Sequence, residues 1–253
     1  MTEPINPFSL SGKTILVTGA SSGIGKSVAI ACSKMGADVV ITGRNEERLT
    51  STLLQLEGTS NIQIATDLTK IVDIENLVTQ LPPIDGVVHC AGIGERSLLK
   101  RVKEDDIHKV MRINFEAPVL LQKTLLQNKK IKKNSSIVFI ASRAPFAPTI
   151  GNGLYAASKG ALIAYAKVLG LELSSQMIRV NCICPAMVWT ELVRHDAEIT
   201  GIDYHVEELK YPLKRYGQPE DIANLAVYLL SDASSWMTGS CIDITGGGEF
   251  TLK

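Results

Sequence analysis

Several features that would mark other protein classes are scarce or missing in this chain of 253 residues. Its five cysteines include no Cys-x-x-Cys pair and no histidine at a metal-ligand spacing, so neither a disulfide framework nor a metal site is expected. No run reaches the roughly 18 apolar residues needed to cross a bilayer. Lys plus Arg and Asp plus Glu number 26 each, which leaves no net charge to attract nucleic acid or an anionic membrane.

The first ten residues also lack the apolar run of a secretory signal, and they contain Pro4 and Pro7. We therefore expect a cytoplasmic protein with reduced cysteines. The chain is 45% hydrophobic and 21% charged, which is the composition of a globular protein. A compact chain of this length buries roughly 70–75% of its unfolded surface. We predict a single domain over residues 1–253.

Short β-branched or apolar runs alternate with longer amphipathic stretches along the whole chain. Several runs are apolar without alternation, as in strands buried on both faces of a parallel sheet. The pattern predicts an α/β fold, a doubly wound sheet of seven parallel strands flanked by helices. The predicted strands are 14–18, 38–42, 62–65, 86–89, 136–140, 179–184 and 241–244, and the predicted helices are 25–35, 71–80, 105–127, 155–174 and 220–231.

One long stretch, about 189–212, has no clear period and is predicted to be irregular. It is longer than most connections in compact domains, which favours a lid or substrate-binding loop. A poorly ordered surface loop is the alternative.

The first predicted strand runs directly into a glycine-rich turn, and a helix follows. Glycines allow a tight turn and a close approach of backbone N–H groups to a pyrophosphate, while the helix N-terminus supplies partial positive charge. The spacing G-x-x-x-G-x-G departs from the usual dinucleotide fingerprint, so a purely structural role for the glycines stays open. The predicted dinucleotide site comprises Gly19, Ser21, Ser22, Gly23, Ile24 and Gly25.

A phenol and an ammonium group lie four residues apart on one predicted helix, at Tyr155 and Lys159. The spacing alone is weak evidence, because Tyr211 and Arg215 share it. Ser142, at the carboxyl end of the fifth predicted strand, strengthens the hypothesis. When hydride reaches a carbonyl carbon, a donor must protonate the oxygen, and a nearby lysine that stabilises the phenolate would ease transfer from a tyrosine. We predict that Tyr155 is the acid/base.

With these residues in place, the chain resembles the classical short-chain dehydrogenase/reductase family. Thr18 and the three glycines match its TGxxxGxG motif, and the resemblance spans essentially the whole chain, with a Rossmann-type fold implied. The set Asn114, Ser142, Tyr155 and Lys159 matches its catalytic tetrad.

The resemblance also implies individual roles for the tetrad. Ser142 is expected to hydrogen-bond the substrate oxygen, and Lys159 is also expected to hold the nicotinamide ribose. Asn114 is expected to support a water that relays protons.

Further family motifs follow in order. Asp67, with Leu68 beside it, is expected to contact the adenine, and the Ala91-Gly92 pair to line the cofactor cleft. One departure precedes that pair, because His89-Cys90 replaces Asn-Asn. The first asparagine braces neighbouring strands in the family, and whether His89 does so is open.

The segment 185–190 resembles the Pro-Gly-x-Val-x-Thr segment of the family, with Ala186 in place of glycine. By this resemblance Pro185, Val188 and Thr190 belong to the cofactor site, and Val188 and Thr190 are expected near the nicotinamide.

The end of the second predicted strand indicates which dinucleotide binds. An acidic residue there would accept from the ribose 2′-OH of NAD, but Gly43 occupies the position and Arg44 follows. A guanidinium favours a 2′-phosphate, and Asn45 offers a neutral donor. An exposed arginine at a helix start is the alternative. We predict NADP(H), with NAD(H) less favoured.

These observations predict an NADPH-dependent oxidoreductase that reduces a small-molecule carbonyl, a ketone or 3-oxoacyl group, to an alcohol. The alternatives are a nucleotide-binding regulatory protein on the same fold and an NAD-linked alcohol dehydrogenase of the same family. The lysines of segment 129–133 would suit an acidic acyl carrier protein, although they also suit a helix C-terminus. Family members usually form dimers or tetramers through the two long helices, so we expect a homodimer or homotetramer.

Overall fold

A seven-stranded parallel sheet forms the centre of the protein. The computed structural model describes residues 6–248, apart from the side chains of residues 195, 196, 199 and 200. The strand order is β3-β2-β1-β4-β5-β6-β7, and every pair is parallel. The strands are β1 (Thr14–Thr18), β2 (Asp38–Gly43), β3 (Ile62–Ala65), β4 (Ile84–His89), β5 (Ile131–Ile140), β6 (Arg179–Pro185) and β7 (Cys241–Ile244).

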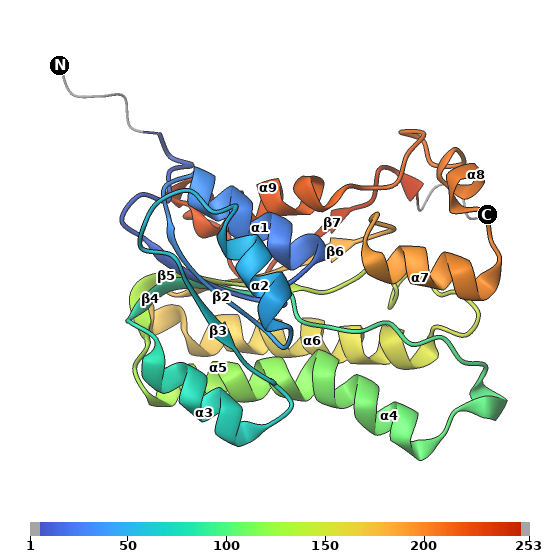
Figure 1. Ribbon diagram of the computed structural model, residues 1–253, viewed down its shortest axis with the longest axis horizontal. Helices are drawn as coiled ribbons and strands as arrows, with labels where there is room; N and C mark the ends of the chain where they lie inside the picture. The colour runs from blue at the N-terminus through green and yellow to red at the C-terminus, as the bar shows by residue number, and fades with distance from the viewer. Residues whose placement is uncertain (1–5, 249–253) are drawn as a thin grey trace.

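Helices cover both faces of this sheet, with α1 and α9 on one face and α3, α5 and α6 on the other (Figure 1). Three-residue 3₁₀ turns lie at Leu99–Arg101, Ser174–Gln176 and Asp232–Ser234. The predicted doubly wound fold is confirmed. The helices are α1 (Gly23–Lys34), α2 (Glu46–Leu53), α3 (Ile71–Gln80), α4 (Glu104–Met111), α5 (Ala117–Gln127), α6 (Gly153–Glu172), α7 (Glu191–Thr200), α8 (Tyr204–Glu208) and α9 (Pro219–Leu230).

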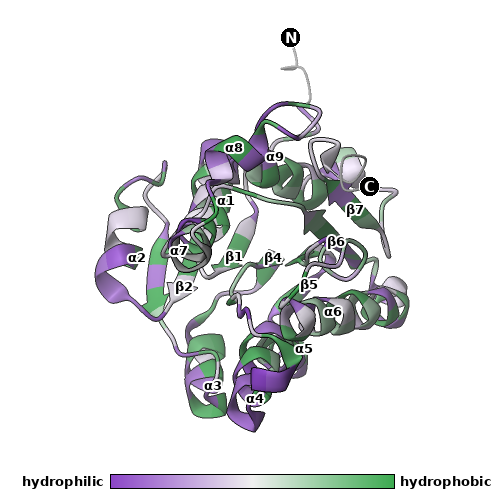
Figure 2. Cartoon of the chain, turned by 90° about the vertical axis from the view of Figure 1, so that its right-hand side faces the viewer, coloured by the Kyte–Doolittle hydropathy of each residue, from purple (hydrophilic) through white to green (hydrophobic). Residues whose placement is uncertain are grey.

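The central strands lack alternation because each is buried on both faces. In β1, Ile15 and Val17 pack into the core beneath α1 and α9, whereas Leu16 packs into the core on the opposite face. Successive side chains of a strand point to opposite faces, so both must be apolar. Figure 2 looks onto the carboxyl ends of the strands, with the helices arranged around them.

The strand order reverses between β1 and β4, because the chain runs outward through β2 and β3 on one side of β1 and through β5, β6 and β7 on the other side of β4. In an open parallel sheet the crevice outside such a switch point is where ligands bind. The glycine turn follows β1 and the Ala91-Gly92 pair follows β4, so the sheet places both at this crevice.

Two sequence predictions about the elements are wrong. The predicted irregular stretch 189–212 contains α7 and α8, and the predicted continuous helix 105–127 is interrupted by a π-helical turn at Arg112–Glu116. Thr190 is the N-cap of α7, and its hydroxyl accepts from Val193 N. Gly201, with φ +67°, is the C-cap. Both are ordinary helix boundary signals, which the missing apolar period obscured. No helix within residues 6–248 is long and apolar enough to cross a membrane.

Candidate active site

Each of the three glycines in the turn after β1 has a structural reason. A Cβ on Gly19 would lie 2.8 Å from Ala91 Cα, and a Cβ on Gly25 would lie 2.3 Å from Gly19 O. Gly19 and Gly23 have φ values of +65° and +52°, and the nearest atom to a Cβ on Gly23 is Thr190 Cγ2 at 3.4 Å. Gly19 and Gly25 therefore allow close backbone packing, and Gly19 and Gly23 allow the left-handed backbone of the turn.

The N-terminus of α1 suits an anion. Ser22 is the N-cap in extended backbone, its side chain makes no cap hydrogen bond, and the first turn contains no acidic residue. Ser21 is half-buried with its hydroxyl beside Gly43, and Ile24 packs against the core below. The free N–H groups and the helix dipole together favour a pyrophosphate here.

A hollow of about 230 Å³ opens between the ends of β2 and β3 and is lined by Arg44, Ala65, Thr66 and Asp67. Asp67 accepts from the backbone N–H of Thr69 at 3.1 Å and from its hydroxyl at 2.7 Å. Burial raises the pKa of Asp67, whereas the hydrogen bonds from Thr69 lower it. The net pKa is below its ordinary value, so the carboxylate is ionised at neutral pH. Leu68 is buried beside it in the core.

Arg44 is exposed and forms no ion pair within the described part of the chain. Asn45 has a structural function that the sequence analysis missed, because its Oδ1 caps α2 by accepting from Arg48 N at 2.9 Å. Only its amide hydrogens are left for a ligand.

The Ala91-Gly92 pair is fixed by the threonine of the glycine motif. The N–H groups of Cys90 and Ala91 donate to Thr18 Oγ1 at 3.1 and 3.2 Å. A Cβ on Gly92 would lie 3.2 Å from Asn114 Oδ1 and 3.4 Å from Lys159 Nζ. Two members of the predicted tetrad therefore meet beside Gly92, which has no side chain to separate them.

His89 is not a strand brace of the kind the family asparagine supplies. Its Nε2 lies 3.2 Å from Gln122 Oε1 on α5, and its ring stacks on Phe139 at 4.6 Å between centroids. Burial lowers the pKa of His89 to about 4, so the ring is neutral at pH 7 and Nε2–H donates to Gln122. His89 thus links β4 to α5 behind the site.

Ser142 and Tyr155 meet at the carboxyl end of β5, where α6 begins. Ser142 lies near enough to the Tyr155 hydroxyl to lower the pKa of the phenol. Ser142 Oγ accepts from Ala144 N at 3.1 Å, which leaves its own proton for donation to a ligand. The pKa of Tyr155 is raised above its ordinary value by burial, against the opposing effect of the Ser142 hydrogen bond. The phenol therefore holds its proton at neutral pH.

Lys159 lies one turn further along α6, with Nζ 5.8 Å from the centroid of the Tyr155 ring. Nζ donates to Ile140 O at 2.8 Å, and the side chain is buried. Burial lowers the pKa of Lys159 to about 8. The sequence led us to expect that the lysine would make the phenol more acidic, but in this structure burial of the phenol is the larger effect.

Asn114 occupies the centre of the π-helical turn and is buried. Its Oδ1 accepts from Ile93 N at 2.8 Å, and its Nδ2 donates to Ile93 O at 2.9 Å and to Ser158 Oγ at 3.0 Å. The side chain thus ties the loop after β4 to α6. A π-turn of this kind often marks a functional position.

The segment after β6 completes the site. Pro185 ends the strand, Val188 is buried and forms a parallel bridge with Gly217, and Trp189 N donates to Gly217 O at 2.8 Å. Thr190 follows beside Gly23. The predicted cofactor residues of this segment therefore lie on the same edge of the sheet as the glycine turn.

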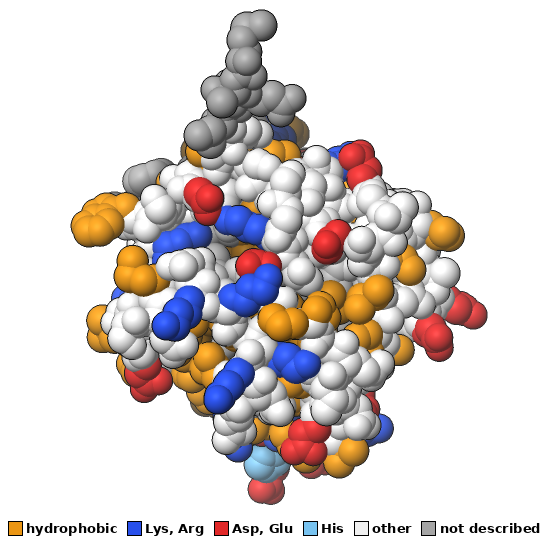
Figure 3. Space-filling model, turned by 90° about the vertical axis from the view of Figure 1, so that its left-hand side faces the viewer, with side chains coloured by type: hydrophobic (Ala, Val, Ile, Leu, Met, Phe, Trp, Pro, Cys, Tyr) orange, Lys and Arg blue, Asp and Glu red, His pale blue; other side chains and the backbone are white. Residues whose placement is uncertain are grey.

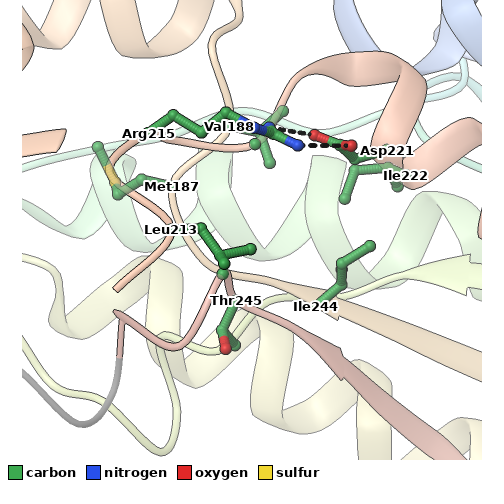
Figure 4. A pocket seen from close by; sticks show the side chains of 10 residues that line it. Met187, Val188, Leu213, Arg215, Asp221, Ile222, Ile244 and Thr245 are labelled. Atoms are coloured by element: carbon green, nitrogen blue, oxygen red, sulfur yellow. Dashed lines mark hydrogen bonds and ion pairs between the residues drawn. The ribbon is translucent and has the colours of Figure 1, made fainter. Parts of the chain in front are cut away.

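A pocket of about 240 Å³ lies next to this segment, and its labelled side chains surround a small hollow closed on one side by an Arg215–Asp221 pair with 2.6 and 3.0 Å bonds (Figure 4). Neither Ser142 nor Tyr155 lines it, so we do not assign the reacting carbonyl to it. Its lining residues are Met187, Val188, Leu213, Arg215, Gly217, Asp221, Ile222, Ile244, Thr245 and Gly246.

The lysines of segment 129–133 lie where β5 begins, at the amino ends of the strands. Figure 3 shows this end of the molecule, with several Lys and Arg side chains near the middle of the face. Lys132 pairs with Asp85 at 2.8 Å, and Lys130 donates to Leu81 O. Because Ser142 lies two residues beyond the end of the same ten-residue strand, about 30 Å of chain separates these lysines from the site. They are not placed to receive a carrier that delivers a substrate to Ser142.

Comparison with known proteins identifies the family. A family model described as Enoyl-(Acyl carrier protein) reductase matches residues 19–249. The chain is 34% identical to 3-oxoacyl-[acyl-carrier-protein] reductase FabG from Rickettsia felis over 238 residues, 94% of this chain and 97% of the relative. The chain belongs to the classical short-chain dehydrogenase/reductase family.

Solved structures agree with this assignment. A short-chain type dehydrogenase/reductase from Mycobacterium marinum superposes with a TM-score of 0.87 at 31% identity, covering 96% of this chain and 97% of that one. An NAD(P)-dependent gluconate 5-dehydrogenase from Beutenbergia cavernae, with bound NADP, gives 0.86 at 29% identity over 97% and 100% of the two chains. This short-chain dehydrogenase/reductase is thus an oxidoreductase acting on CH–OH or C=O groups.

Proposed function

We propose that this short-chain dehydrogenase/reductase uses NADPH to reduce a ketone, with Tyr155 as the proton donor. The observation that carries the proposal is the meeting of Ser142, Tyr155 and Lys159 at the carboxyl ends of the strands, beside an uncapped helix N-terminus. The residues present fit a dinucleotide, because the N-terminus of α1 has neither a side-chain cap nor an acidic residue in its first turn, and the Arg44–Asp67 hollow is large enough to begin an adenosine site.

The residues would hold the cofactor along one edge of the sheet. Arg44 and Asp67 would bind its adenosine end, the N-terminus of α1 its pyrophosphate, and Val188 and Thr190 its nicotinamide end. The reduced nicotinamide supplies the hydride when bound. All other steps below belong to side chains of this chain.

As the carbonyl oxygen gains charge, the Ser142 hydroxyl donates a hydrogen bond to it, and Tyr155 transfers its phenolic proton. The phenol is protonated at neutral pH, as a proton donor must be. The positive charge of Lys159 favours the phenolate that is left behind. Asn114 connects the loop at Ile93 to α6, and so fixes the position of that loop relative to the helix that carries Tyr155.

The first substrate class to test is a 3-oxoacyl thioester. The Rickettsia felis relative is named for 3-oxoacyl groups on acyl carrier protein, whereas the Beutenbergia cavernae neighbour is named for gluconate. We also propose a cytoplasmic location, a small-molecule substrate and a homo-oligomer.

The test of the proposal is Tyr155→Phe assayed by NADPH oxidation at 340 nm with acetoacetyl-coenzyme A. The variant deletes the proton donor and keeps the ring, so kcat should fall about 10²- to 10⁴-fold while the Kd for NADPH stays within about twofold. Ala156→Ser, on the same helix, is the matched control and should retain activity. A Tyr155→Phe enzyme with the kcat of the wild type would refute the assignment.

A further inference from the structure

An ion pair connects the two helices that flank the proposed cofactor cleft. Arg48 lies on α2, one turn after Arg44, and Glu191 is the first residue of α7. Their charged groups are 2.7 Å apart, Arg48 Nη1 to Glu191 Oε2, although 143 positions separate them in the sequence. Figure 2 shows α7 in front of the ends of β1 and β2, beside α1 and α2.

The start of α7 covers the glycine turn. Thr190, the N-cap of α7, places its methyl group 3.4 Å from where a Cβ of Gly23 would be. Gly23 thus lies directly against the start of α7, and Arg44, which lines the hollow, precedes α2. A dinucleotide that extended from that hollow past the glycine turn to Tyr155 would lie beside the two helices that the Arg48–Glu191 pair connects.

We propose that Arg48 and Glu191 are positioning residues that form a latch, defined as their ion pair, which holds α7 over the bound dinucleotide and slows its release. The inference rests on the proposed function, because it needs a dinucleotide in this cleft. Neither side chain is required to touch the cofactor. The latch holds α7, whose N-cap is Thr190, and so closes the cleft on the side opposite the sheet.

The expected effect is modest. The two side chains are 54% and 57% exposed, so solvent weakens their attraction. An exposed pair of this kind changes an equilibrium or a rate by about two- to fivefold. It should also depend on salt, because the screening length falls to about 3 Å at 1 M ionic strength.

The alternative role for Arg48 is direct binding of the 2′-phosphate, since it follows Arg44 closely. The two roles differ in the cofactors they affect. A latch between two protein side chains acts equally on NADPH and NADH, whereas a phosphate ligand acts on NADPH alone. They also differ in Glu191, which matters only to the latch.

The experiment measures the dissociation rates of NADPH and NADH by stopped-flow fluorescence of the reduced nicotinamide. Arg48→Gln and Glu191→Gln should each raise both rates about two- to fivefold at low salt, and the difference from wild type should vanish near 1 M salt. The double variant should release cofactor no faster than Glu191→Gln alone, because each change removes the same interaction. Asp232→Asn, which breaks the 2.6 Å Lys13–Asp232 pair at the other end of the sheet, is the control and should leave both rates unchanged.

Three results would overturn the latch. They are unchanged dissociation rates in both single variants, additive effects in the double variant, and an effect of Arg48→Gln on NADPH only. A wild-type protein that binds neither reduced dinucleotide would instead refute the proposed function, and the latch with it.

Discussion

At the scale of single residues, the preference between the two dinucleotides is predicted to depend on Gly43 and Arg44. Arg44 is exposed at the mouth of the Arg44–Asp67 hollow and forms no ion pair or side-chain hydrogen bond within residues 6–248, so it is available to a 2′-phosphate. A charge-assisted hydrogen bond of about 1.5–3 kcal/mol corresponds to roughly a 10- to 150-fold preference for NADPH. We expect this ratio in kcat/KM for the two cofactors with one common ketone.

Combining Gly43→Asp with Arg44→Ser should reverse the preference. A Cβ at position 43 would lie 3.4 Å from Ser21 Oγ and 3.6 Å from Leu49 Cδ2, which are ordinary van der Waals contacts. Its carboxylate would accept from the ribose hydroxyl of NAD and repel a phosphate. Lys34→Ser removes a positive charge elsewhere and should leave the ratio unchanged. A wild type that uses NADH equally well would show that Arg44 is only a surface residue.

The pH dependence of the reduction is expected to come from Lys159. Its pKa is lowered to about 8 by burial, so the ammonium is charged at pH 7 and loses its proton as the pH rises through about 8. Because the charge stabilises the phenolate of Tyr155, kcat should fall above this pH. Lys159→Arg keeps a charge that does not titrate there, so its residual activity should lack the fall near pH 8. The same alkaline limb in both proteins would assign it to another group.

At the scale of elements, the sequence predicts the strands well and the connections between them poorly. Apolar runs such as those of β1 and β2 are readily recognised, because burial on both faces makes most of their positions apolar. The α2 helix was missed because its eight residues bury only Leu49 and Thr52 on one side, which is too short a pattern to show a helical period. From the sequence its N-cap residue, Asn45, is interpreted instead as a hydrogen-bond donor to the 2′-phosphate.

The residues of the candidate site also differ in how far the sequence predicts them. Tyr155, Lys159 and the glycine turn could be found from spacing and resemblance, because a fixed helix or turn sets their geometry. The π-turn around Asn114 and the linkage of His89 to Gln122 could not, since both depend on contacts between segments distant in the sequence. The Arg48–Glu191 pair is of this kind as well.

At the scale of the whole molecule, α6 carries catalytic residues toward the cleft and an apolar stripe outward. Four of its exposed positions repeat at helical spacing and are apolar, Ala157, Ala164, Val168 and Leu171, with the exposed Lys167 and Glu172 beside them. Val168 and Leu171 are 54% and 76% exposed, although the opposite side of the helix is packed in the core. We propose that another copy of the chain covers this apolar stripe.

The homo-oligomer is therefore expected to assemble through α6, and a charge placed in the stripe should weaken it. Val168→Glu would bury an unpaired carboxylate at the contact, so light scattering after size exclusion should show a smaller species than the wild type. Leu54→Glu, at an exposed leucine just after α2, is the matched control and should leave the assembly unchanged. If the Val168→Glu protein keeps the mass of the wild type, or if the wild type is itself a monomer, α6 is not an interface and its stripe is an exposed surface.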